Sequence, residues 1–224
     1  MELQGKVVNF LGDSITEGVG VTDCENNRYD RVILRKCGLK AANNYGIGGT
    51  RLAHQIHPSD KPRYDLCFCG RAYDLDKGAD LVVVYGGVND FIHGDAPFGA
   101  EGDKTPATFC GGVEFLMTLL QETYPNATIV FMTPARMRFF ELCDTQVSQR
   151  PGKQLDAKPL AAYVDVIKAA GERHNIPVLD LYTKLPIDPK VAEERERYTI
   201  DGLHFNDAGH AVLAQCLIDF LEQL

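Results

Sequence analysis

The chain has 224 residues, of which 45% are apolar and 24% charged, close to the usage of ordinary globular proteins. This composition excludes disordered, collagen-like and coiled-coil classes, and the length predicts one domain over residues 1–224. The 23 Lys and Arg residues against 31 Asp and Glu residues give a net charge of −8, which argues against nucleic acid as a partner because phosphate neutralisation needs a basic surface.

Cysteine usage and the N-terminal sequence favour a cytoplasmic protein. Seven cysteines cannot all pair in disulfides, and they fit reduced, buried thiols better than a metal site because they are scattered. The first residues lack the basic and apolar regions of a secretory signal. Apolar stretches such as 81–85 are far shorter than the ~20 residues of a membrane span. We therefore expect a cytoplasmic protein with no membrane span.

Hydrophobic patterning predicts alternating strands and helices. In chain order, we predict a strand at 6–11, a helix at 29–37, strands at 41–47 and 79–85, a helix at 109–123, a strand at 127–132, a helix at 159–174, a strand at 176–181 and a helix at 207–224. Strands that are apolar on both faces indicate a parallel sheet covered by helices on both sides. The expected class is α/β with about five strands, and the long irregular stretches 94–108 and 136–158 are candidate functional loops or lids.

Polar residues follow the predicted strands, at the edge where parallel sheets bind ligands. Ser14 follows the first strand and has two interpretations that the position alone leaves open. It is a natural helix N-cap, with Glu17 at the capping-box position. It could equally be a nucleophile presented at a strand-to-helix turn.

Three further residues near the strand ends have both a chemical and an ordinary interpretation. Asp201 and His204 are three apart, so the carboxylate could hold the imidazole tautomer that takes a proton from serine, although such a pair is more often on the surface. Asn89 could donate its side-chain N–H to a developing oxyanion, or it could be a turn residue.

Four segments, in this order, together resemble the SGNH (GDSL-type) hydrolase family: Gly12-Asp13-Ser14-Ile15, the segment 44–50 with Gly49, Gly87-Val88-Asn89-Asp90 and Asp201-Gly202-Leu203-His204. Each is modestly specific alone, but the four span nearly the whole chain at plausible spacing. The resemblance implies a flavodoxin-like, three-layer α/β/α fold with strand order 2-1-3-4-5. It also implies a serine ester hydrolase, of the esterase, lipase or acylhydrolase kind, that uses neither metal nor cofactor.

The resemblance also implies a role for each site residue. Ser14 is the expected nucleophile, His204 the general base and then acid, and Asp201 the partner that orients the imidazole. The expected oxyanion hole consists of the backbone N–H groups of Ser14 and Gly49 and the side chain of Asn89. Gly48 is the alternative glycine, but the family's spacing from Asn44 favours Gly49.

The expected reaction is removal of a small acyl group, such as acetyl, from an oxygen ester of a carbohydrate or small alcohol. Its motivation is the set of polar and aromatic residues expected around the site: Arg51, Asp90, Phe91, His93, Phe98, Arg136 and Arg138. A lysophospholipase or thioesterase is the rival enzyme, with an apolar groove supplied by Phe139, Phe140 and Leu142. The rival from another class is a small-ligand binding module on the same scaffold. The oligomeric state stays open.

The remaining histidines have structural interpretations. His54 and His57, near His93, lack a close acidic third ligand and have Pro58 directly after them, which favours rim or solvent positions over a metal site. His174 and His210 lie on predicted helices and are expected to be structural.

Overall fold

The computed structural model describes residues 1–138, 156 and 158–224. Within them, five parallel strands form one sheet in the order β2-β1-β3-β4-β5. The strands are β1 (Val7–Gly12), β2 (Ala41–Gly46), β3 (Leu81–Tyr85), β4 (Thr128–Met132) and β5 (Val178–Leu179). The predicted α/β class and the strand order 2-1-3-4-5 are confirmed.

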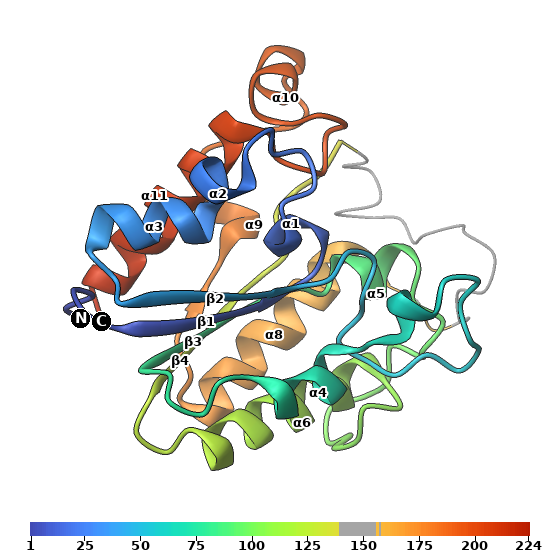
Figure 1. Cartoon of the computed structure of the whole chain (residues 1–224). Helices are drawn as coiled ribbons and strands as arrows, with labels where there is room; N and C mark the ends of the chain where they lie inside the picture. Colours follow the sequence, from blue (N-terminus) through green and yellow to red (C-terminus); the bar gives the residue numbers. More distant parts are fainter. Residues whose placement is uncertain (139–155, 157) are drawn as a thin grey trace.

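Long helices cover both faces of the sheet, which makes the three layers visible in Figure 1. One face carries α3 (Tyr29–Cys37) and α11 (Asp207–Glu222), and the other carries α6 (Phe109–Thr123) and α8 (Leu160–His174). All four helices lie within two residues of their predicted bounds. Glycine or asparagine in the left-handed conformation ends two of them, Gly38 after α3 and Asn175 after α8.

The central strand β3 is fully buried because both of its faces are covered. Val82 and Val84 pack into the core under α6 and α8, whereas Leu81 and Val83 pack into the core under α3 and α11. This alternation is the two-residue period of a strand, and it explains why the whole segment is apolar.

The predicted fifth strand is shorter than expected. Only Val178–Leu179 pairs with β4, because Asp180 caps a short helix, α9 (Leu181–Lys184), and accepts the N–H of Thr183. An aspartate with a side-chain oxygen free to accept such a bond favours a helix start over continuation of a strand.

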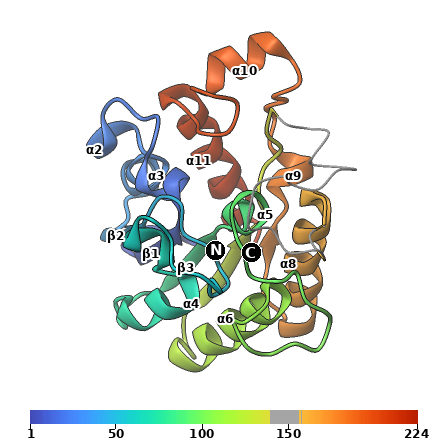
Figure 2. The ribbon, with the colours of Figure 1, turned by 90° about the vertical axis from the view of Figure 1, so that its right-hand side faces the viewer.

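Short helices lie in the connections between the strands and the long helices, and Figure 2 views the molecule from the side on which the strands end. They are α1 (Ser14–Glu17), α2 (Cys24–Asn27), α4 (Phe68–Arg71), α5 (Val88–Ile92), α10 (Ala192–Tyr198) and the 3-10 helices η1 (Pro62–Asp65) and η2 (Ala72–Asp74). The stretch 94–108 forms no helix or strand, as expected, and most of 136–158 lies outside the described residues. No helix in the described ranges has the length and apolar character to cross a membrane.

Candidate active site

Ser14 is the first residue of α1, directly after the end of β1. The helix is capped by Asp13, whose Oδ1 accepts the N–H of Ile15 at 3.1 Å. The N-cap interpretation of Ser14 is therefore wrong. A Cβ at Gly12 would lie 1.9 Å from Oγ1 of Thr16, so only glycine allows α1 to fold back so closely over the end of β1.

Ser14, His204 and Asp201 are hydrogen-bonded in series. Ser14 Oγ lies 2.9 Å from His204 Nε2, and His204 Nδ1 lies 2.7 Å from Asp201 Oδ2. Asp201 Oδ1 also accepts the backbone N–H groups of Leu203 and His204, at 2.9 and 2.8 Å. A carboxylate can only accept here, so Nδ1 carries the proton and Nε2 is left to accept from the serine hydroxyl.

The Asp201 carboxyl is held in its ionised form. Its partial burial would raise the pKa, but the hydrogen bonds from His204 and Leu203 outweigh burial and keep the pKa below its ordinary value. An anionic Asp201 is what stabilises a positive charge on the imidazole during proton transfer.

The turn that presents Asp201 and His204 is closed by backbone pairing. Thr199 and Phe205 form an isolated antiparallel bridge, and Thr199 Oγ1 accepts the N–H of Gly202 at 2.9 Å. Gly202 has φ of +82°, a conformation that glycine adopts without strain. The turn thus directs the imidazole toward α1.

The loop after β2 packs against the serine. A Cβ at Gly48 would lie 3.4 Å from Cβ of Ser14, so the glycine allows this close approach. The N–H of Gly48 donates to Glu17 Oε2 at 2.7 Å. Within the described residues, the N–H groups of Ser14 and Gly49 have no acceptor.

Asn89 lies on α5, directly after β3, and is buried. Its Nδ2 donates to Asp13 Oδ2 at 3.3 Å, which uses one of the two amide hydrogens. Burial raises the pKa of the Asp13 carboxyl from 3.8 to about 6. The structure thus places all the predicted site residues at the carboxyl edge of strands β1, β2 and β3 or beside it.

Two buried charged residues support this edge, and the sequence analysis missed the first of them. The Arg71 guanidinium donates to the carbonyl of Gly12 at 3.0 Å and to Thr50 Oγ1 at 2.9 Å. Burial lowers the pKa of Arg71 to about 10, which still leaves it charged at neutral pH. Asp90 accepts the N–H groups of Leu52 and Ala53 at 2.8 and 3.0 Å and so fixes the loop after Gly49.

Several residues predicted at the substrate edge have interior roles instead. Arg51, Asp90 and Phe91 are buried, and Arg51 donates to the carbonyl of Tyr64 at 2.9 Å. The Tyr64 ring lies against Gly49, where a Cβ would be 2.7 Å from it. The predicted apolar groove at 139–142 lies outside the described residues.

The other histidines are not gathered into a site. His54 and His57 are exposed, and His57 Nδ1 lies 3.1 Å from Asp95. His210 is buried, stacks on Tyr29 and accepts its N–H, and burial lowers its pKa to about 4, in keeping with the structural interpretation. The described part of the chain holds no group of three or more His, Cys, Asp or Glu residues placed to bind a metal.

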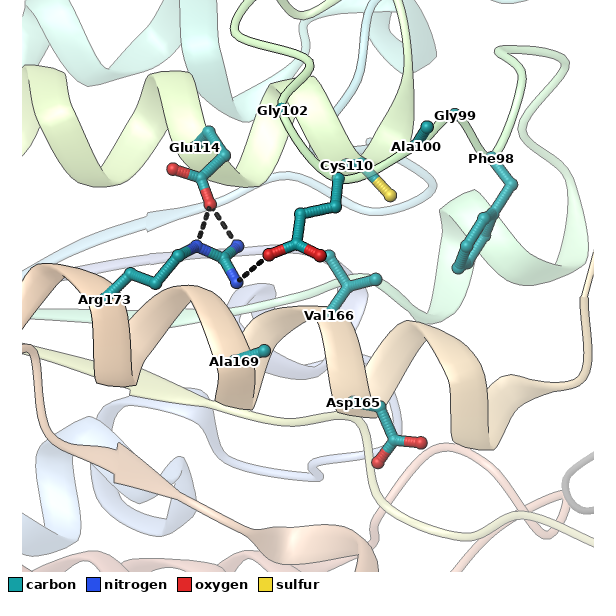
Figure 3. A pocket seen from close by; sticks show the side chains of 11 residues that line it. Phe98, Gly99, Ala100, Gly102, Cys110, Glu114, Asp165, Val166, Ala169 and Arg173 are labelled. Carbon is teal, nitrogen blue, oxygen red and sulfur yellow. Dashed lines mark hydrogen bonds and ion pairs between the residues drawn. The ribbon is translucent and has the colours of Figure 1, made fainter.

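A separate pocket of about 280 Å³ lies between α6, α8 and the segment 98–102 (Figure 3). The Arg173 guanidinium faces it and is paired with Glu114 and Glu101, so its charge is already neutralised. Ser14, His204 and Asp201 do not line this pocket.

A parallel sheet of this order, with serine, histidine and aspartate in series at its carboxyl edge, is typical of serine hydrolases. The model of the GDSL-like lipase/acylhydrolase family matches residues 10–212, and the chain belongs to this family. It is a carboxylic ester hydrolase.

Solved structures share the fold over nearly the full chain. A protein from Lactobacillus plantarum is 27% identical, with a TM-score of 0.81 and 98% of each chain covered. An acetyl xylan esterase is 21% identical, with a TM-score of 0.61 and coverage of 95% of this chain and 98% of that one. A mutant acetyl-xylooligosaccharide esterase from Geobacillus Stearmophilus is 20% identical, with a TM-score of 0.59 and coverage of 99% and 96%. No curated protein matches the chain.

Proposed function

We propose that the protein is a serine esterase that removes a small acyl group, such as acetyl, from an oxygen ester of a carbohydrate or other small alcohol. The observation that carries this proposal is the hydrogen-bonded series Ser14, His204 and Asp201, at 2.9 and 2.7 Å. This series supplies a nucleophile, a base and a group that fixes the tautomer of the base.

Acylation begins when Ser14 Oγ attacks the carbonyl carbon of the ester and its proton passes to His204 Nε2. The carbonyl oxygen becomes an oxyanion, and the Asp201 carboxylate stabilises the imidazolium. When the tetrahedral intermediate collapses, the bond to the alcohol oxygen breaks and His204 gives its proton to that oxygen. Water, deprotonated by His204, then attacks the acyl group on Ser14 and releases the carboxylic acid.

We assign the oxyanion donors to the backbone N–H groups of Ser14 and Gly49 and to Nδ2 of Asn89. Two observations support Gly49 over its neighbour: the Gly48 N–H already donates to Glu17, and the Gly49 N–H has no acceptor among the described residues. Nδ2 of Asn89 keeps one hydrogen beyond the one that Asp13 accepts. Donors fixed in a partly dry site are worth roughly 10²–10³-fold each in turnover.

The preference for a small acyl group is supported by the Tyr64 ring, which lies against Gly49 and so narrows the space beside the proposed oxyanion hole. The names of two structural neighbours, an acetyl xylan esterase and an acetyl-xylooligosaccharide esterase, point the same way. A series of p-nitrophenyl esters tests the preference. A maximum of kcat/KM at acetate supports it, and a maximum at octanoate or longer favours the lysophospholipase or thioesterase alternative.

A binding module on the same scaffold would not need an activated serine. Labelling of Ser14 by a fluorophosphonate therefore separates the esterase from this alternative, because the reagent reacts with a serine whose proton a base removes. Absence of labelling, together with absence of ester hydrolysis, would contradict the proposed mechanism.

A further inference from the structure

We infer that Glu17 is a positioning residue of the oxyanion hole, an inference that rests on the proposed esterase function. Glu17 is the last residue of α1, three positions after Ser14, so the two side chains lie on the same face of this single turn. Its side chain is 34% exposed, and each of its two carboxylate oxygens has a partner on a different segment.

The first partner is the backbone of the loop after β2 that contains Gly48 and Gly49, called the glycine loop below. Glu17 Oε2 accepts the N–H of Gly48 at 2.7 Å, and a Cβ at Gly48 would lie only 2.7 Å from the same oxygen. Hydrogen bonds to an ionised acceptor are short and strong. The carboxylate therefore fixes the peptide that precedes Gly49 against the helix that carries Ser14.

The second partner holds the adjacent wall of the site. Glu17 Oε1 pairs with Nη2 of Arg63 at 2.5 Å, and Arg63 lies on η1 beside Tyr64. The Tyr64 ring in turn contacts Gly49. One carboxylate thus connects α1, the glycine loop and η1, the three segments that surround the proposed Gly49 donor.

The consequence concerns which of two neighbouring N–H groups is offered to substrate. Gly48 and Gly49 are both free of a side chain, and Gly49 has φ of +78°, so this turn has little rigidity of its own. By occupying the Gly48 N–H, Glu17 fixes the orientation in which the Gly49 N–H stays available. A displacement of about 1 Å in a catalytic group can lower the rate by about 10²-fold. We therefore expect the loss of Glu17 to lower kcat.

The test compares Glu17→Met with Glu17→Gln on p-nitrophenyl acetate, because the two side chains have similar length and helix propensity and differ in the acceptor oxygen. Glu17→Met should lower kcat by roughly 10- to 100-fold while KM changes by less than about 3-fold. Glu17→Gln should stay within about 5-fold of the parent protein, because its amide oxygen still accepts the Gly48 N–H.

Glu25→Met is the matched control. Glu25 also lies on a one-turn helix and pairs with an arginine, Arg31, at 3.6 Å, but it makes no contact with the glycine loop. Its loss should leave kcat unchanged. A double-mutant cycle of Glu17→Met with Asn89→Ala adds a measurement that a merely structural role would not change. If Glu17 acts through the oxyanion hole, kcat of the double variant falls by less than the product of the two single fold-losses.

Each outcome decides the inference. Equal kcat values for Glu17→Met and Glu17→Gln would overturn it. So would loss of the cooperative unfolding transition in Glu17→Met alone, or a kcat loss in the double variant equal to the product of the two single losses. A parent protein that neither hydrolyses the ester nor reacts with fluorophosphonate would remove the proposed function and this inference together. An active, labelled parent with an equally active Glu17→Met would remove the inference only.

Discussion

Nδ2 of Asn89 donates to Oδ2 of Asp13 at 3.3 Å, which joins the residue before the serine to the first helix after β3. At pH 7, above the pKa of about 6, the Asp13 carboxyl is mainly ionised and can only accept, so it faces the amide nitrogen of Asn89 and not the amide oxygen. The amide of Asn89 therefore has a defined orientation, with its second hydrogen left for substrate.

Asn89→Ala should lower kcat by roughly 10²-fold or more, because it removes one of three proposed oxyanion donors. The fold should persist, since Asn89 lies at the edge of the core. Steady-state kinetics with p-nitrophenyl acetate and a thermal melt measure the two effects. Asn126→Ala, at an exposed position, is the control. Full activity in Asn89→Ala would remove this residue from the oxyanion hole.

Asp13→Asn should change how stability depends on pH. Because burial raises the pKa of Asp13 from 3.8 to about 6, the folded protein retains at pH 5 a proton that the unfolded chain has lost. The contribution of Asp13 to the free energy of unfolding is therefore fully present below about pH 4. It is lost as the pH rises through about 6, and the loss amounts to about 3 kcal/mol.

Urea unfolding of the parent and of Asp13→Asn between pH 4 and pH 7 checks this sign. The free energy of unfolding of the parent, minus that of the variant, should fall as pH rises. Asparagine is a good N-cap, and its single side-chain oxygen can still accept the N–H of Ile15, so the variant is expected to fold although it loses the bond from Asn89. A difference in the free energy of unfolding that does not change with pH would show that Asp13 has the same pKa in the folded and unfolded states.

Tyr64→Ala should shift the acyl preference toward longer chains. Removing the ring opens space beside Gly49, so the ratio of kcat/KM for the p-nitrophenyl hexanoate to that for the acetate should rise by roughly 10-fold. Tyr73→Ala, at a side chain that is 58% exposed, should leave the ratio unchanged. An unchanged ratio in Tyr64→Ala would mean that another wall sets the acyl length.

Much of the fold follows from local sequence. The strand 81–85 and the helices 29–37 and 109–123 are long enough for their apolar period to appear, and their observed bounds match within two residues. The short helices α1, α5 and α9 have four or five residues, too few for a helical period. Only their caps or the glycines before them mark them, as Asp13 does for α1.

The proposed catalytic residues could be found because each follows a strand or precedes a helix in a recognisable segment. The residues that hold them in place could not be predicted in this way, because Arg71 and Glu17 bind backbone groups of segments that are distant in the sequence. Arg51 illustrates the opposite error: its position after the glycines predicted a substrate contact, but its guanidinium is buried against the carbonyl of Tyr64. Spacing along the chain does not indicate which side of a turn a side chain takes.

The central claim is that Ser14 is the nucleophile of an esterase, and hydrolysis of p-nitrophenyl acetate by the parent protein and by Ser14→Ala tests it most directly. The account predicts rapid nitrophenolate release by the parent and a loss of roughly 10³-fold or more in the variant, with an unchanged thermal melt. Equal release by the two proteins would contradict it.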